Sequence, residues 1–294
     1  MDTLADIDLR EGYAELSEAR LHYMEAGPDS GPGVVLLHGF PDFWYSWRHQ
    51  IPALAAAGFR VIAPDMRGYN LSSKPAEVSA YEPRRVAGDI RELIAERGFE
   101  RACLAGHDWG AAIAWVVAMA HPEVVERLAI LNVPHPRRML EGLRRPGTQI
   151  AKSWYMFFFQ LPWLPERAVR ADDWRAFRYG FEHDARPGAF TPEDIERYRE
   201  AWSQPGAATA TINYYRASMR RPPAARRGAL RPVTAPTLVI WGEHDRYLSS
   251  SLAEPGREDV PGLTGVVRLP EASHWVQHDE PDRVSELLIG HFKA

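Results

Sequence analysis

Apolar residues along this chain follow two alternating patterns. Short uninterrupted runs, such as residues 34–37 and 238–241, are typical of strands that are buried on both faces of a parallel sheet. Longer stretches, such as residues 46–57, place their apolar side chains on one face of a helix. The alternation predicts strand–helix–strand crossovers, and therefore an α/β fold with a mostly parallel central sheet.

The expected strands and helices are not spread evenly along the chain. We expect strands at residues 13–16, 20–24, 34–37, 60–64, 102–105, 128–133, 237–241 and 266–269, the first two forming an antiparallel edge, and helices at 46–57, 84–97, 111–120, 191–202, 208–219 and 281–292. Between about residues 134 and 230, Pro-rich turns separate helical stretches only. The sequence therefore predicts a core domain, residues 1–133 and 229–294, interrupted by an all-helical cap (lid) domain, residues 134–228. Because open α/β sheets bind ligands at the carboxyl ends of their strands, this cap would cover the pocket.

Charge and composition exclude several classes of protein. The 35 basic and 39 acidic residues give a formal net charge of -4, which indicates neither a nucleic-acid partner nor an acidic tail. The longest apolar run, residues 111–120, is about half as long as a membrane span, so we expect no span. Residues 1–6 show no signal-peptide pattern, and the single Cys103 excludes internal disulfides, so we expect a cytoplasmic protein.

The segment Gly106-His107-Asp108-Trp109-Gly110 lies between an expected strand and an expected helix. Glycine at both second neighbours of Asp108 indicates a very tight turn that pushes the central side chain into a pocket. Serine holds this position in the G-x-S-x-G nucleophile elbow, whereas here it is a carboxylate. An alternative is that Asp108 only caps the following helix, which Asp does well, and the two roles are compatible.

A carboxylate at this turn predicts a particular chemistry. Its ordinary pKa of about 4 leaves it ionised at pH 7, so it can attack an sp³ carbon without a base to activate it. The product of that attack is an ester, which water can hydrolyse, whereas the ether formed by a serine could not be hydrolysed in this way. Asp108 therefore indicates alkyl transfer followed by hydrolysis.

Hydrolysis of the ester requires a base for water, and His274 directly follows the last expected strand. A carboxylate is needed to orient its imidazole, and Glu243 and Asp245 both follow the strand at residues 237–241. Asn132 also ends a strand but cannot serve as an ionised acid. The order nucleophile, acid, histidine is that of an α/β-hydrolase triad.

The tetrahedral intermediate also needs an oxyanion hole, which in this architecture comes from two backbone N–H groups. We assign these groups to Trp109, which follows Asp108, and to Phe40, which follows His38 and Gly39. Because both contributions come from the backbone, the two side chains are free to shape the pocket.

Five short segments resemble those of the α/β-hydrolase-fold epoxide hydrolases, and the resemblance covers nearly the whole chain. The matching segments are His38-Gly39-Phe40-Pro41, Gly106-His107-Asp108-Trp109-Gly110, Asn213-Tyr214-Tyr215-Arg216, Gly242-Glu243-His244-Asp245 and Ser273-His274-Trp275. The resemblance favours Asp245 over Glu243 as the acid. It also implies that Tyr215 and Tyr155 hydrogen bond the epoxide oxygen, because phenols stay protonated at pH 7. The chain departs from the family at Arg67-Gly68-Tyr69-Asn70, where a second glycine after the tyrosine is more usual.

By this resemblance the chain is expected to add water to an apolar aromatic or alkyl epoxide, giving a vicinal diol, with no cofactor and no metal. We expect the substrate pocket to include Phe40, Trp109, Trp154 and Phe158. The oligomeric state stays open between a monomer and a homodimer.

Two other functions are weighed against this one. A haloalkane dehalogenase would share Asp108 and Trp109 but usually has a polar side chain at the position of Phe40, and a fluoroacetate-type enzyme would have Arg where Trp109 and Ala112 stand. A non-catalytic binding protein of the same fold would be expected to lose triad members, yet the nucleophile, acid and histidine are all present.

Overall fold

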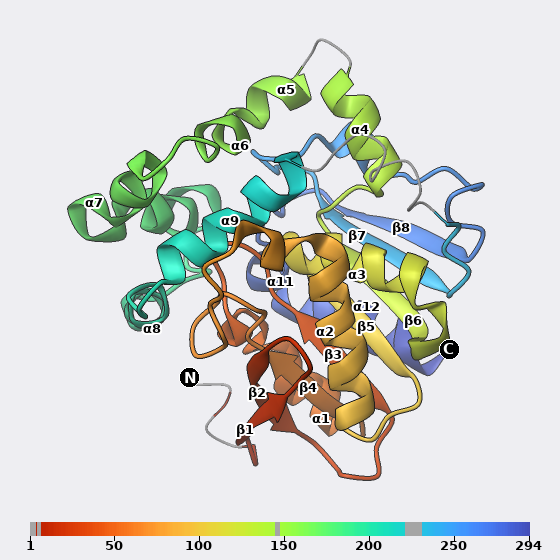
Figure 1. Cartoon of the computed structure of the whole chain (residues 1–294). Coiled ribbons are helices and arrows are strands. Elements are labelled where there is room, and N and C mark those ends of the chain that lie inside the picture. Colours follow the sequence, from red (N-terminus) through yellow and green to blue (C-terminus); the bar gives the residue numbers. More distant parts are fainter. Residues whose placement is uncertain (1–3, 5–6, 145–147, 221–230) are drawn as a thin grey trace.

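A single mixed sheet forms the centre of the molecule in a computed structural model that describes residues 4, 7–144, 148–220 and 231–294 (Figure 1). Its strands are β1 (Arg10–Glu15), β2 (Arg20–Ala26), β3 (Gly33–Leu37), β4 (Arg60–Pro64), β5 (Ala102–His107), β6 (Val125–Leu131), β7 (Thr237–Gly242) and β8 (Leu263–Leu269). They follow the order β1-β2-β4-β3-β5-β6-β7-β8. Strand β2 is antiparallel to β1 and β4, and all other pairs are parallel. The predicted α/β class with an antiparallel edge is confirmed.

Helices cover both faces of the sheet. They are α1 (Gln50–Ala56), α2 (Pro83–Glu96), α3 (Trp109–Ala120), α11 (Val276–Asp279) and α12 (Pro281–Lys293), with short 3₁₀ turns η1 (Trp44–Trp47), η2 (Val78–Tyr81), η3 (Pro122–Val124) and η5 (Ser250–Leu252). Alternate residues of β3 point to opposite faces: Val35 and Leu37 join the core beneath α2 and α3, whereas Val34 and Leu36 join the core beneath α1 and α12. All four side chains are fully buried, which explains the uninterrupted apolar run.

Several expected boundaries differ from those observed: β1 begins at Arg10 rather than at residue 13, β8 begins at Leu263 rather than at residue 266, and two further differences have a clear physical reason. The helix expected at residues 46–57 is a 3₁₀ turn followed by α1, which begins at Gln50. Pro52 explains this difference, because proline fits the first turn of a helix but breaks its interior. The strand expected at residues 128–133 is β6, which begins at Val125 and ends at Leu131, because Asn132 has a left-handed backbone conformation (φ 49°).

The described part of the segment between β6 and β7 is helical. It contains α4 (Pro136–Arg144), α5 (Thr148–Lys152), α6 (Trp154–Phe158), α7 (Leu164–Tyr179), a π-helical turn (Gly180–Asp184), α8 (Pro192–Trp202) and α9 (Ala207–Arg220). These helices form the upper part of the molecule in Figure 1, coloured green to cyan. The predicted boundary at residues 228 and 229 lies outside the described residues, and the division into two domains stays a prediction.

Hydrogen bonds join these helices to the sheet region at several separate points. The Asp194 carboxylate of α8 accepts hydrogen bonds from the Tyr45 hydroxyl (2.8 Å) and from the Arg48 guanidinium (3.2 Å). The Trp202 indole N–H donates to the Pro41 carbonyl (2.6 Å), and the Tyr214 hydroxyl of α9 donates to the carbonyl of Arg67 (2.7 Å). Within the described residues, no helix has both the length and the apolar character needed to cross a bilayer.

Candidate active site

A tight turn between β5 and α3 holds Asp108 in a strained conformation, with φ 48° and ψ −120°. Both flanking glycines are required by close backbone approach. A Cβ on Gly110 would lie 2.1 Å from the carbonyl oxygen of Leu37, and a Cβ on Gly106 would lie 2.5 Å from the backbone of Gly110. The turn therefore has the geometry that its sequence predicts.

Asp108 occupies the N-cap position of α3, but its side chain makes no capping hydrogen bond. Instead, its Oδ1 accepts a hydrogen bond from the backbone N–H of Phe40 (2.7 Å), and its Oδ2 lies 3.6 Å from Nε2 of His274. Trp109 is the first residue of α3, where a backbone N–H has no acceptor within the helix. One oxygen of Asp108 thus lies at a backbone donor, while the other faces the imidazole.

The imidazole of His274 is held from its other side by Asp245, with 2.7 Å between Nδ1 and Oδ2. The second oxygen of Asp245 accepts the backbone N–H groups of Tyr247 and Leu248 at 2.7 and 2.8 Å. Glu243 forms an ion pair with Arg268 instead (2.7 Å). The structure thus brings Asp108, His274 and Asp245 together and leaves Glu243 out.

Asn132 is a residue that the sequence analysis considered only as an acid and rejected. Its Nδ2 donates to Oδ2 of Asp245 (2.7 Å), and its Oδ1 accepts the N–H of Gly242 (2.8 Å). The amide therefore fixes both the acid and the end of β7. The parallel pairing of β6 with β7 places these groups side by side, and that pairing was the signal that could have revealed this contact.

Electrostatics in the triad favour charge separation. Burial opposes the imidazolium, yet the carboxylates of Asp245 and Asp108 raise the pKa of His274 from 6.5 to about 10. Burial likewise opposes both carboxylates, but their attraction to His274 holds the pKa values of Asp108 and Asp245 below their ordinary range. Asp108 is therefore ionised at neutral pH, and His274 is protonated while Asp108 carries its charge.

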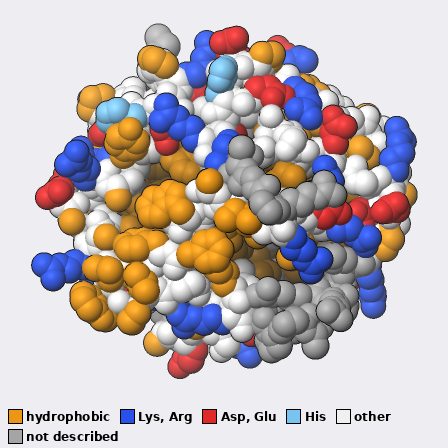
Figure 2. All heavy atoms as spheres, turned by 90° about the horizontal axis from the view of Figure 1, so that it is seen from above, with side chains coloured by type: hydrophobic (Ala, Val, Ile, Leu, Met, Phe, Trp, Pro, Cys, Tyr) orange, Lys and Arg blue, Asp and Glu red, His pale blue; other side chains and the backbone are white. Residues whose placement is uncertain are grey.

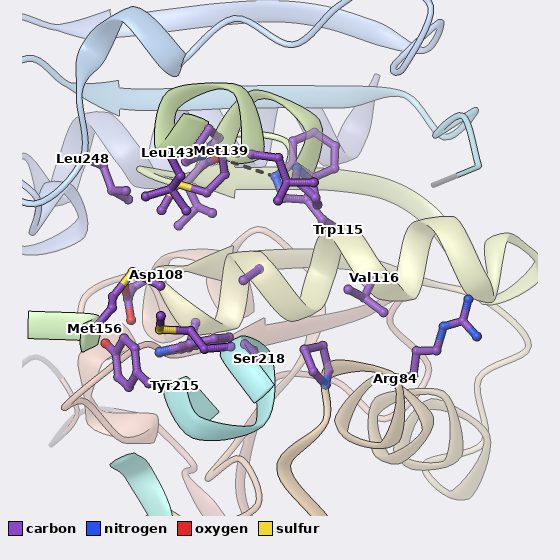
Figure 3. A pocket seen from close by; sticks show the side chains of 18 of the residues that line it. Arg84, Asp108, Trp115, Val116, Met139, Leu143, Met156, Tyr215, Ser218 and Leu248 are labelled. Atoms are coloured by element: carbon purple, nitrogen blue, oxygen red, sulfur yellow. Dashed lines mark hydrogen bonds between the residues drawn. The ribbon is translucent and has the colours of Figure 1, made fainter. Parts of the chain in front are cut away.

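Two phenols face this carboxylate from the helical segment. Tyr155 comes from α6 and Tyr215 from α9, and their ring centroids lie 5.7 Å apart. Burial and the nearby charge of Asp108 raise the pKa values of both Tyr155 and Tyr215 well above the ordinary value of 10. Both side chains are thus protonated hydrogen-bond donors, and they line one cavity together with Asp108 (Figure 3).

The cavity has a volume of about 370 Å³. It is lined mainly by apolar side chains from α3, α4, α6 and α9: Trp109, Ala112, Trp115, Val116, Met119, Met139, Leu140, Leu143, Met156, Phe157, Met219 and, from the loop after β7, Leu248. Figure 3 shows Asp108, Met156 and Tyr215 close together at one end, with Val116 and Arg84 towards the other. The carboxylate of Asp108 therefore lies at one end of a mainly apolar cavity.

The expected pocket residues are placed unequally. Trp109 lines the cavity, whereas Phe40 is not among the lining residues: its backbone N–H contacts Asp108, and its ring packs on that of Tyr215 at 5.2 Å. Trp154 and Phe158 are not among the lining residues: Trp154 is 65% exposed, and the two rings pack on each other one helical turn apart at 6.2 Å. Met156 and Phe157 of the same short helix line the cavity in their place.

Other lining residues were not foreseen. The side chains of α3 could not be assigned to the cavity from the sequence, because α3 is apolar on all sides. The side chains of α4 could not be assigned either, because no sequence motif in that helix indicates a binding site. Within the described part of the chain, no three His, Cys, Asp or Glu side chains are grouped so that they could hold a metal ion.

Comparison with known proteins identifies the family of the chain. The family model for the alpha/beta hydrolase fold matches residues 32–281. The AB hydrolase superfamily protein YfhM of Bacillus subtilis is 43% identical over 273 residues, 93% of this chain and 94% of that protein. Human epoxide hydrolase 4 is 38% identical over 277 residues, 92% of this chain and 75% of that protein. The solved structure of Bacillus megaterium epoxide hydrolase in complex with an inhibitor has a TM-score of 0.87 at 33% identity, covering 96% of this chain and all (100%) of that one. The chain therefore belongs to the α/β-hydrolase fold family and, within it, to the epoxide hydrolases.

Proposed function

We propose that this epoxide hydrolase adds water to an apolar epoxide through a covalent ester on Asp108. The observation that carries this proposal is the pairing of an ionised carboxylate with two protonated phenols across an apolar cavity. The carboxylate is a nucleophile that needs no activation, and the phenols can hydrogen bond the oxygen that leaves the attacked carbon.

In the first step, Oδ2 of Asp108 attacks one epoxide carbon. A new carbon–oxygen bond forms, the ring carbon–oxygen bond breaks, and its electron pair stays on the ring oxygen. Tyr155 or Tyr215 gives a proton to that oxygen, because an alkoxide is a stronger base than a phenolate. Oδ2 is the attacking atom since Oδ1 already accepts the N–H of Phe40.

In the second step, water attacks the carbonyl carbon of the ester. Esterification removes the charge of Asp108, so the pKa of His274 falls, the imidazolium gives its proton to the phenolate left by the first step, and the neutral imidazole can then accept a proton from water. The backbone N–H groups of Phe40 and Trp109 stabilise the oxyanion. Collapse of the intermediate releases the diol and returns Asp108 as a carboxylate, and the proton taken from water stays on His274, which restores the imidazolium beside that carboxylate.

The cavity supports a lipophilic substrate. Its volume of about 370 Å³ is near the lower end of the range for small-molecule sites, and apolar side chains make up most of its lining. The residue beside the nucleophile is Trp109, and Ala112 follows on the next helical turn, so no cation lies there to hold a substrate carboxylate. We infer that residues 134–228 act as the lid that closes this cavity.

The ester can be trapped in a His274→Ala variant. Asp108 remains a nucleophile without the imidazole, whereas hydrolysis loses its base, so the intermediate should accumulate. Opening an epoxide expels no leaving group, and the mass of the intact protein should therefore rise by the full mass of the epoxide. A peptide map should locate the added mass on Asp108.

Two further variants make this experiment decisive. Asp108→Ala combined with His274→Ala should give no adduct, and His121→Ala, at the opposite end of α3, should turn the epoxide over without accumulating one. An adduct formed only with haloalkanes, which would add their mass less that of hydrogen halide, would favour a dehalogenase. Absence of any adduct in a folded His274→Ala protein would refute the covalent mechanism.

A further inference from the structure

Exposed large apolar side chains are concentrated in one short stretch of the helical segment. Of the nine exposed large hydrophobic residues in the described structure, six lie within residues 150–164, and they are named the cap patch here: Ile150, Trp154, Phe157, Leu161, Trp163 and Leu164. Trp154 and Trp163 are 65% and 67% exposed. Single exposed apolar residues are normal on a protein surface, but a cluster that includes two exposed tryptophans indicates an interaction surface.

The cap patch adjoins the active-site cavity. Phe157 belongs to both, because it lines the cavity and is also 53% exposed. Trp154 lies one helical turn before it, on the same side of α6. In Figure 2, which views the molecule from above, hydrophobic side chains gather around a recess on this face. A molecule bound to the cap patch would therefore lie next to the cavity at Phe157.

The chain around the cap patch is strongly basic. Residues 137–170 contain seven Lys and Arg but only two acidic residues, although the whole chain carries a formal charge of -4. Both of these acids are paired, Glu141 with Arg138 and Glu166 with Arg216, at 2.6 Å in each case, and Arg137 pairs with Asp259 at 3.0 Å, so the excess of positive charge comes from the other five cations. The exposed Arg167 and Arg170 line a shallow surface groove together with Trp163. The apolar surface is therefore bordered by positive charge.

We propose that the cap patch docks on the surface of a membrane that contains anionic phospholipid. Tryptophan favours the boundary between headgroups and acyl chains, and arginine next to the surface is attracted by anionic headgroups. A protein partner bound to the cap patch would cover the neighbouring end of the cavity. A bilayer would instead leave the cavity in contact with a phase that dissolves apolar molecules. If the proposed function holds, a lipophilic epoxide reaches Asp108 from the membrane without crossing water.

Vesicle flotation tests this docking without any need for turnover. The full-length protein is mixed with vesicles of phosphatidylcholine alone or of equal parts phosphatidylcholine and phosphatidylglycerol, and the share that floats is measured. Wild type should float with the anionic vesicles, and salt should weaken the binding. Trp154→Ser with Trp163→Ser, and separately Arg167→Glu with Arg170→Glu, should each weaken it about tenfold or more.

Matched controls are Tyr13→Ser on β1 and Arg91→Glu on α2. They change an exposed aromatic residue and an exposed cation that lie outside the helical segment carrying the cap patch. Both should float like wild type, and circular dichroism should show that every variant is folded. Failure of wild type to float, or equal losses in the controls, would overturn the proposal. A homodimer that dissociates on the tryptophan substitutions, without vesicle binding, would assign the cap patch to a second copy instead. Failure of the covalent mechanism alone would leave the flotation result unchanged.

Discussion

The change in protonation of His274 during turnover can be measured with a single substitution. Asp108→Ala removes the same negative charge that ester formation removes, while leaving the His274–Asp245 pair in place. At an effective dielectric constant of about 20, two unit charges at the observed 3.6 Å attract by roughly 4 to 5 kcal/mol, which sets an upper limit of about 3 for the change in pKa. The pKa of His274, about 10 in the wild type, should therefore fall by roughly 2 to 3.

Nitrogen-15 NMR of the imidazole side chains provides the assay. At pH 8.5 the His274 ring should give the chemical shifts of an imidazolium in the wild type and mainly those of a neutral imidazole in Asp108→Ala. The signal is assigned by its loss in His274→Gln. Glu243→Gln, which removes a carboxylate paired with Arg268 rather than with the triad, should leave the His274 shifts unchanged. If the imidazole is charged to the same extent with and without Asp108, the proposed switch from acid to base is wrong.

Three further predictions concern the tyrosines, the turn and Asn132. Tyr155→Phe and Tyr215→Phe should each slow alkylation, and the double variant should alkylate about 10²–10⁴ times more slowly than the wild type. Stopped-flow quenching of tryptophan fluorescence would measure the alkylation rate. An unchanged rate in the double variant would leave both phenols with packing roles only. Gly110→Ala should lower the free energy of unfolding by about 1–3 kcal/mol or more in urea titrations, whereas Gly88→Ala, whose added methyl meets open space in α2, should not lower it. Asn132→Ala should slow ester hydrolysis about 10- to 100-fold in single-turnover experiments while leaving alkylation nearly intact, because Asp245 and Gly242 lose hydrogen bonds whereas Asp108 loses none; equal slowing of both steps would contradict this.

The sheet was predictable because its pattern is local. Residues 34–37 and 238–241 are apolar on both faces, and strands β3 and β7 contain these two runs. The grouping of Asp108, Asp245 and His274 was also foreseeable, because each follows the end of a strand and parallel strands end at one edge. The beginning of α1 was predicted too early, although Pro52 indicated the correct position. Proline fits the first turn of a helix, so the helix should begin shortly before residue 52.

The cavity lining was less predictable because it depends on contacts between distant segments. Helix α3 is apolar all round, so its pattern does not separate the side that faces the sheet from the side that lines the cavity. Helix α6 has only five residues, too few for periodicity to show that Met156 and Phe157 line the cavity whereas Trp154 does not. The bond between Asn132 and Asp245 required the pairing of β6 with β7, whose residues are far apart in sequence.

The pairing of β6 with β7 also has a consequence for how such an enzyme can diversify. These neighbouring strands are separated in the chain by residues 132–236, so a very long connection joins two strands that pair directly with each other. The entropy of closing a loop grows only with the logarithm of its length, and doubling the connection would cost about 0.6 kcal/mol. The segment that supplies the tyrosines and much of the cavity wall can therefore be lengthened, shortened or exchanged at little cost to the sheet. Substrate range can change in this way while the turn that holds the nucleophile stays the same.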